Sequence, residues 1–207
     1  CLAFEVLRLR PCLLVLWPPF WHPGFEVVHL SIPRKERILM RGPEVSVESV
    51  TDSVTGLPDG RVFTVVLERK IALARRTLKP ISVVYFRVDE FESFAPYIRE
   101  HAMRATSRVI TNTVRESDTI CGLGDGVLVA LLDDTSEAGA VWAADRVRKA
   151  NGESPSRDVV SLSAGVACYP SHSMDADELL AAAEVACARA QAHGPGRIEV
   201  AVEADEI

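Results

Sequence analysis

The chain has 207 residues and a mass of 22.6 kDa, with 48% hydrophobic and 25% charged residues and a formal net charge of −6, which is an ordinary globular composition. The acidic balance excludes a general nucleic-acid binder, because affinity for the phosphate backbone needs a basic face. Five scattered cysteines without a Cys-x-x-Cys pair exclude a disulfide framework and a zinc site, and indicate reduced cytosolic thiols.

Residues 1–45 differ from the rest of the chain. They contain six of the twelve prolines and carry a net charge of +2, which leaves −8 for the remaining residues. The apolar stretch Pro11–Trp21 is shorter than the ~20 residues of a membrane helix, so we expect no membrane span. We expect a linker or the tail of an upstream region, in which Phe25–Ile32 could form one strand. A cleaved signal sequence is the alternative, although Pro18 and its bulky neighbours make a poor cleavage site.

The chain begins at Cys1 rather than at a methionine, which suggests a fragment, a processed chain or an unusual start. From the reduced thiols we expect a cytoplasmic protein, which a missing upstream region could tether to a membrane.

Residues 46–202 alternate between strand-like and helix-like segments, which predicts one domain, followed by a C-terminal tail at 203–207. Spacing, β-branched runs and capping residues predict the elements in chain order: a helix from Phe63 to Leu78 that Lys79-Pro80 ends, a strand at Ile81–Val88, a helix at Tyr97–Val114, strands at Thr119–Leu123 and Val127–Leu132, a helix marked by Ala138, Val141, Trp142 and Val147, a strand at Val159–Ala167, a helix capped by Asp175 and ended by Gly194, and a strand at Arg197–Val202. Gly124-Asp125-Gly126 lies between two of these strands and predicts a hairpin, because the tight turn needs residues that accept positive φ.

No nucleophile elbow, phosphate-binding glycine loop or histidine pair occurs in the chain. A different set of short motifs occurs in a fixed order: Asp52-x-x-Thr55-Gly56-Leu57-Pro58-Asp59, Val88-Asp89-Glu90-Phe91, the Gly124 hairpin, Ser163-Ala164-Gly165-Val166-Ala167-x-Tyr169-Pro170 and Asp177-Glu178-Leu179-Leu180-Ala181-Ala182-Ala183-Glu184. Together they resemble the GGDEF domain family, the diguanylate cyclases that condense two GTP molecules into cyclic di-GMP. The resemblance covers about residues 50 to 200.

The resemblance implies an α/β (α+β) fold, similar to nucleotidyl-cyclase and polymerase palm domains, with a central five-stranded sheet flanked by helices. It also implies a dimer in which each domain presents one GTP with a divalent metal ion. Such chemistry requires carboxylates that hold Mg²⁺ against the triphosphate.

The residues at those positions differ from the family pattern. The signature Gly-Gly-Asp-Glu-Phe falls on Gly124, Asp125, Gly126, Val127 and Leu128, so glycine stands at the metal-binding acidic position. The other metal-binding Asp falls on Arg87, whose positive charge would repel Mg²⁺. We therefore expect no catalytic residues, no metal site and no cofactor, with Mg²⁺ relevant only if residual cyclase activity exists.

Further departures surround the expected nucleotide pocket. By the resemblance, four family residues are replaced in this chain. A lysine is replaced by Glu92, a base-contacting asparagine by Ala95, a phosphate-contacting lysine by Gln191 and an arginine by Pro195. Asp125 could replace the missing acid by a shift of one position, but it lacks a second carboxylate. Asp89 remains from the acidic pair, where a strand-end cap or a salt bridge to Arg87 is the structural alternative to catalysis.

A second site of the family is retained in sequence. Many members carry an Arg-x-x-Asp product-inhibition site nine residues before the signature, and Arg115-Glu116-Ser117-Asp118 lies at that distance from Gly124. Arg115 offers a planar fork to guanine or phosphate, Asp118 can accept from guanine N–H groups, and Arg146 matches an arginine that some members add. The structural alternative is an exposed i, i+3 ion pair at a helix end.

Three hypotheses follow. The first is a catalytically inactive GGDEF-type signalling domain that binds cyclic di-GMP through Arg115, Asp118 and Arg146. The second is an interaction scaffold that binds no nucleotide and forms a homodimer, or a heterodimer with a related domain. The third is a residual cyclase.

Overall fold

The computed structural model describes residues 50–153 and 160–202. The predictions for residues 1–45, for the strand at Phe25–Ile32 and for the tail at 203–207 lie outside the described residues. The account below concerns the described part of the chain alone.

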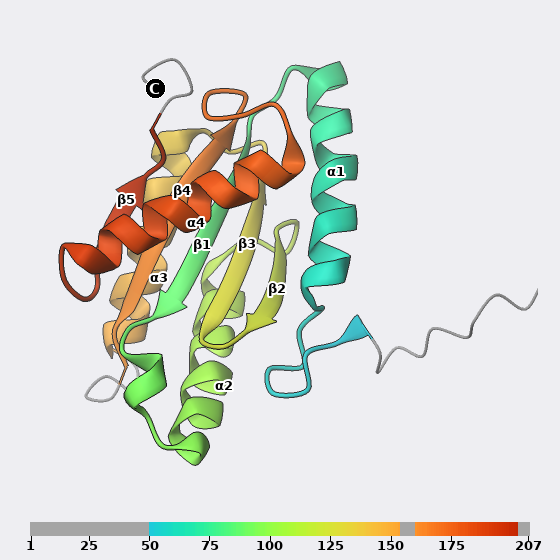
Figure 1. Cartoon of the computed structure of the whole chain (residues 1–207). Coiled ribbons are helices and arrows are strands. Elements are labelled where there is room, and N and C mark those ends of the chain that lie inside the picture. The colour runs from blue at the N-terminus through green and yellow to red at the C-terminus, as the bar shows by residue number, and fades with distance from the viewer. Residues whose placement is uncertain (1–49, 154–159, 203–207) are drawn as a thin grey trace, which may run out of the picture. The chain divides into compact units, whose positions relative to one another are not determined.

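Five strands form one mixed sheet in the order β2-β3-β1-β4-β5 (Figure 1). Their bounds are Ile81–Val88 for β1, Thr119–Gly124 for β2, Val127–Asp133 for β3, Leu162–Tyr169 for β4 and Ile198–Val200 for β5. The central strand β1 is antiparallel to both β3 and β4, and only β5 runs parallel to its neighbour. The predicted five-stranded sheet flanked by helices is confirmed.

Four α-helices cover the two faces of the sheet, and a short 3-10 helix, η2, follows β1. Their bounds are Gly60–Thr77 for α1, Phe91–Ser93 for η2, Pro96–Thr113 for α2, Glu137–Glu153 for α3 and Ala176–Ala192 for α4. Figure 1 shows α4 in front of the sheet and α2 and α3 behind it. Helices α1 and α4 share one hydrophobic cluster, and α2 and α3 share the other.

Strand β1 supplies side chains to both clusters, because successive strand residues point to opposite faces. Val83 and Tyr85 pack on the α1 and α4 side, whereas Val84 and Phe86 pack on the α2 and α3 side. This two-sided burial explains why the strand reads as a continuous apolar run in the sequence.

Two aspartates begin helices. The Asp175 carboxylate accepts hydrogen bonds from the backbone N–H groups of Asp177 and Glu178, as the capping pattern predicted. Asp59 caps α1 in the same manner, through the N–H groups of Arg61 and Val62, which the sequence analysis did not anticipate.

Two predicted boundaries were wrong. Helix α1 ends at Thr77, and Leu78 follows it in a left-handed conformation with its side chain 90% exposed. Pro80 disfavours helical backbone at Lys79, so the helix cannot continue past Leu78. Strand β4 begins at Leu162, which pairs with Val88, so the ladder starts where its partner β1 ends. Trp142, one of the residues that marked α3, is 61% exposed.

No helix within residues 50–153 and 160–202 has the length and apolar character that a bilayer crossing requires.

Candidate functional site

The hairpin between β2 and β3 lies beside the C-terminal end of β1. Arg87 is opposite Val127 in the ladder, and the Val88 N–H donates to the Gly126 carbonyl at 2.9 Å. The structure thus brings together the two regions in which the family's metal-binding positions were expected.

The hairpin has three consecutive residues with positive φ. Gly124 and Gly126 both have φ +83°, and Asp125 between them has φ +45°. The two following residues, Val127 and Leu128, are buried in opposite hydrophobic clusters. The degenerate signature therefore forms a turn and two core positions.

Phe91 fills the space beside Gly126. A Cβ atom built on Gly126 would lie 2.7 Å from Cγ of the Phe91 ring, closer than real Cβ atoms approach other heavy atoms. A Cβ on Gly124 would meet nothing within 4 Å. A carboxylate at position 126 would thus overlap a buried aromatic ring, so the site differs from a metal site in shape as well as in charge.

The half-buried Arg87 occupies the other expected metal-ligand position. Among the described residues, no hydrogen bond or ion pair of its guanidinium group is found. Its nearest titratable neighbours include Tyr85 and Cys187, and burial raises the pKa of each to about 12, although the Arg87 charge acts in the opposite direction. The end of β1 is therefore a desolvated environment that already contains a cation.

A magnesium ion does not fit this arrangement. Within residues 50–153 and 160–202, no group of three or more His, Cys, Asp or Glu side chains is placed to hold a metal ion. Mg²⁺ prefers several oxygen ligands in near-octahedral geometry, and here the two equivalent positions hold an arginine and a glycine.

Asp89 survives from the acidic pair as a buried structural hub. Its carboxylate accepts hydrogen bonds from Ser161 Oγ at 2.8 Å, Gln191 Nε2 at 3.0 Å and the Gly196 N–H at 2.8 Å. These partners are the residue before β4, a residue at the end of α4 and a residue of the loop before β5. Of the two alternatives considered for this residue, the structure places it as a strand-end cap, and the salt bridge to Arg87 is absent from the described residues.

A cavity of about 240 Å³ lies between the hairpin and α2, and Phe91, Arg99, Met103 and Asp125 are among its lining residues. The Arg99 side chain donates to the carbonyl oxygens of Phe94 and Glu92, and its guanidinium carbon lies 5.6 Å from the centre of the Phe91 ring. Arg99 therefore holds the segment after β1 in place.

The three residues expected to bind cyclic di-GMP line one cavity at the opposite end of β3. Arg115 and Asp118 come from the turn between α2 and β2, and Arg146 comes from α3. The cavity has a volume of about 80 Å³, well below the roughly 300 Å³ at which enclosed ligand pockets begin. A nucleotide here would lie largely on the surface.

Asp118 also has a structural role in that turn. Its carboxylate accepts from the Arg115 N–H at 2.9 Å and, more weakly, from the Asp133 N–H at 3.4 Å. The expected i, i+3 ion pair between the Arg115 and Asp118 side chains is not among the ion pairs of the described residues. Each carboxylate oxygen has a second lone pair, so the bonds leave Asp118 able to accept from a ligand.

Arg146 is fixed by two neighbours. Its Nη2 donates to the Thr113 carbonyl at 3.0 Å, and its guanidinium carbon lies 4.6 Å from the centre of the Trp142 ring. Trp142 lines the same cavity. In the sequence Trp142 served only to mark the helix, although its i, i+4 spacing from Arg146 could have indicated the contact.

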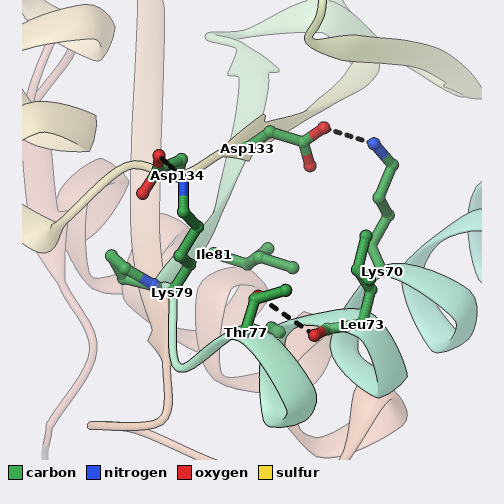
Figure 2. Close-up of a pocket in the computed structure, with 9 residues that line it drawn as sticks. Lys70, Leu73, Thr77, Lys79, Ile81, Asp133 and Asp134 are labelled. Atoms are coloured by element: carbon green, nitrogen blue, oxygen red, sulfur yellow. Dashed lines mark hydrogen bonds and ion pairs between the residues drawn. The ribbon is translucent and has the colours of Figure 1, made fainter.

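A further cavity of about 310 Å³ lies where the end of α1 meets the start of β1. Figure 2 shows ion pairs Lys70–Asp133 and Lys79–Asp134 on either side of Ile81. None of the residues predicted to act in catalysis or binding lines it. Because its lysines and aspartates already pair with one another, it offers little charge for a ligand.

Comparisons with known proteins agree with the sequence resemblance. A family model described as diguanylate cyclase, GGDEF domain, matches residues 49–197. Diguanylate cyclase DosC of Escherichia coli is 30% identical over 162 residues, which make up 72% of this chain and 34% of DosC. The response regulator PleD of Caulobacter vibrioides is 27% identical over 157 residues, or 70% of this chain and 35% of PleD. The chain thus spans about a third of the length of these relatives.

Solved structures show the same fold. The GGDEF domain of TpbB, also called YfiN, from Pseudomonas aeruginosa has a TM-score of 0.66 at 27% identity, and the match covers 73% of this chain and 94% of that domain. The GGDEF domain of DgcB from Caulobacter crescentus, solved in complex with c-di-GMP, has a TM-score of 0.64 at 17% identity, covering 73% and 95%. At this lower identity the likeness concerns the fold alone.

Proposed function

The chain belongs to the GGDEF domain family, and we propose that it acts in cyclic di-GMP signalling as a non-catalytic member that binds cyclic di-GMP at Arg115, Asp118 and Arg146. The observation that carries the proposal is that these three residues, from two separate elements, line one cavity. The loss of catalysis is supported by Arg87 and by the ring of Phe91 against Gly126.

The cavity has the chemistry that a guanine nucleotide needs. The guanidinium of Arg115 has no hydrogen bond or ion pair among the described residues, so its planar fork is available to guanine O6 and N7 or to a phosphate. Asp118 retains lone pairs for guanine N–H groups, and Arg146 is held beside them by Thr113. Two arginines near one carboxylate suit a ligand that carries both phosphates and guanine edges.

Calorimetric titration with cyclic di-GMP tests this proposal. We expect micromolar binding of cyclic di-GMP by the wild-type chain and binding weakened by at least about 100-fold in Arg115→Ala. Arg108→Ala is the matched control, because Arg108 is an exposed arginine on the preceding helix that does not line the cavity. An absence of heat at millimolar ligand for the wild-type chain would refute the binding site.

The catalytic part of the proposal has its own assay. Incubation with GTP and either Mg²⁺ or Mn²⁺ is expected to give no cyclic di-GMP above a protein-free blank. Product that disappears in Asp125→Ala would instead establish a cyclase in which Asp125 replaces the missing acid.

A second candidate function is a scaffold that binds no nucleotide and pairs with a second copy or with a related domain. It is favoured by the two backbone N–H groups that donate to Asp118, because this structural role explains an aspartate at position 118 even when no ligand binds. Sedimentation equilibrium with and without cyclic di-GMP separates the two candidate functions. A dimer whose dissociation constant is the same with and without the ligand supports the scaffold.

We further propose a cytoplasmic location, with an upstream region as the route to any membrane tether. Cys121, Cys168 and Cys187 support it, since all three are buried free thiols of the kind found in reducing compartments.

A further inference from the structure

Trp142 is an exposed aromatic residue on α3, the helix that buries Ala140, Ala144 and Val147 in the core. Its side chain is 61% exposed, whereas Ala140, Ala144 and Val147 of the same helix are fully buried. Core packing therefore does not account for a tryptophan at this position. The residues around its ring at the cavity indicate a role in contact with a ligand.

The indole ring is held in a defined place by Arg146. The guanidinium lies 4.6 Å from the ring centre, within the range of a cation–π contact, and Thr113 accepts a hydrogen bond from the same guanidinium. Both side chains are thereby ordered before any ligand arrives. Preorganised side chains lower the entropy lost on binding.

Trp142 borders the same cavity as Arg115 and Asp118. This cavity is too small to enclose a purine nucleotide, so a bound base must lie against a surface that is already exposed. An ordered indole beside two arginines is such a surface, because purines stack on aromatic rings and nearby cations attract their phosphates.

We propose that Trp142 is a ligand-binding residue of this site, on which one purine base of the cyclic dinucleotide stacks while Arg115 contacts the edge of guanine. The proposal rests on the proposed function and adds a division of roles. Stacking does not depend on base identity, so Trp142 contributes affinity for any purine, whereas Arg115 contributes the preference for guanine.

Titrations of the wild-type chain and four variants with cyclic di-GMP and cyclic di-AMP test this division. Trp142→Ala is expected to weaken both ligands about 10- to 100-fold, and Trp142→Phe, which keeps an aromatic face, less than about 5-fold. Arg115→Ala is expected to remove the preference for cyclic di-GMP. Tyr97→Ala is the matched control, since Tyr97 is also an exposed aromatic residue, at 76% against 61% for Trp142, and does not line the cavity. Thermal unfolding verifies that each variant is folded.

Fluorescence gives an independent measurement. In a Trp17→Phe, Trp21→Phe chain, Trp142 is the one remaining tryptophan, and a stacked guanine is expected to quench its emission. Wild-type affinity in Trp142→Ala, or unchanged emission at saturating ligand, would overturn this inference and leave the proposed function standing. A wild-type chain that binds neither dinucleotide would overturn the proposed function itself.

Discussion

At the hairpin end of β3, polar groups bond to other parts of the protein: the Asp89 carboxylate accepts three internal hydrogen bonds, and Phe91 fills the space beside Gly126. At the other end of β3, Arg115 has no side-chain partner among the described residues and lies with Trp142 on an accessible cavity. The comparison teaches that the two ends differ in how far their polar groups are already engaged. The hairpin end is packed and cross-linked, whereas the Arg115 end keeps ordered groups that can still bond, which is the difference that our proposed function predicts.

The largest expected effect is steric. Gly126→Ala should lower the free energy of unfolding by about 3 kcal/mol, because the new methyl group adds overpacking against Phe91 to the strain of positive φ. Gly124→Ala has the same φ without the overlap, so about 1 kcal/mol is expected there. Urea denaturation measures both, and equal losses would show that Phe91 does not close the site.

The next effect concerns the Asp89 hub. Asp89→Asn should cost about 2 kcal/mol, because an amide N–H₂ would face donors from Ser161, Gln191 and Gly196. The exposed Asp125→Asn, which keeps a residue that tolerates positive φ, should change stability by less than about 0.5 kcal/mol. If chemical denaturation gives the two variants similar free energies of unfolding, the hydrogen bonds of Asp89 do not stabilise the fold.

The dependence of stability on alkaline pH tests how strongly Cys187, which is buried near the end of β1, is desolvated. Burial raises the pKa of Cys187 from 9.0 to about 12, so the folded state retains the thiol proton longer than the unfolded state. This contribution to stability is complete below pH 9 and is lost as the pH rises toward 12, by about 1 kcal/mol between pH 9 and 10. Urea midpoints across this range should fall less in Cys187→Ala; an identical slope would place the thiol in a wetter environment.

The smallest effect on stability is expected for Arg115→Ala, the variant expected to lose the most affinity for cyclic di-GMP. Arg115→Ala should change the free energy of unfolding by less than about 0.5 kcal/mol, since its side chain makes no bond among the described residues. Asp118→Ala should cost about 1 kcal/mol through its lost backbone bonds. A destabilised Arg115→Ala in thermal or urea unfolding would assign that residue to the fold rather than to a ligand.

The sequence predicted much of the fold because its signals were local. The apolar spacing from Phe63 to Ala74, the glycines around Asp125 and the Asp175 cap each act within a few residues, and all three features appear in the structure. Leu78 was misplaced because its spacing continues the apolar pattern although the helix already ends at Thr77, two residues before Lys79, whose backbone Pro80 keeps out of the helical region.

The site was less predictable because its contacts are long-range. Nothing near Gly126 in the sequence indicates that Phe91 fills its space, and the partners of Asp89 lie 72, 102 and 107 residues away. The motif positions showed which residues differ from the family pattern, but not which contacts occupy those positions in the fold. Trp142 likewise gained significance only once its ring was found beside Arg146.

Strand β3 joins the two regions that this comparison separates. It begins at the hairpin with Val127 and ends at Asp133, whose N–H points to Asp118, and β1 and β2 pair with it on either side. Seven extended residues span roughly 20 Å, farther than one side chain can reach across. The strand therefore acts as a rigid spacer, and no single side chain can contact both Arg115 and the hairpin.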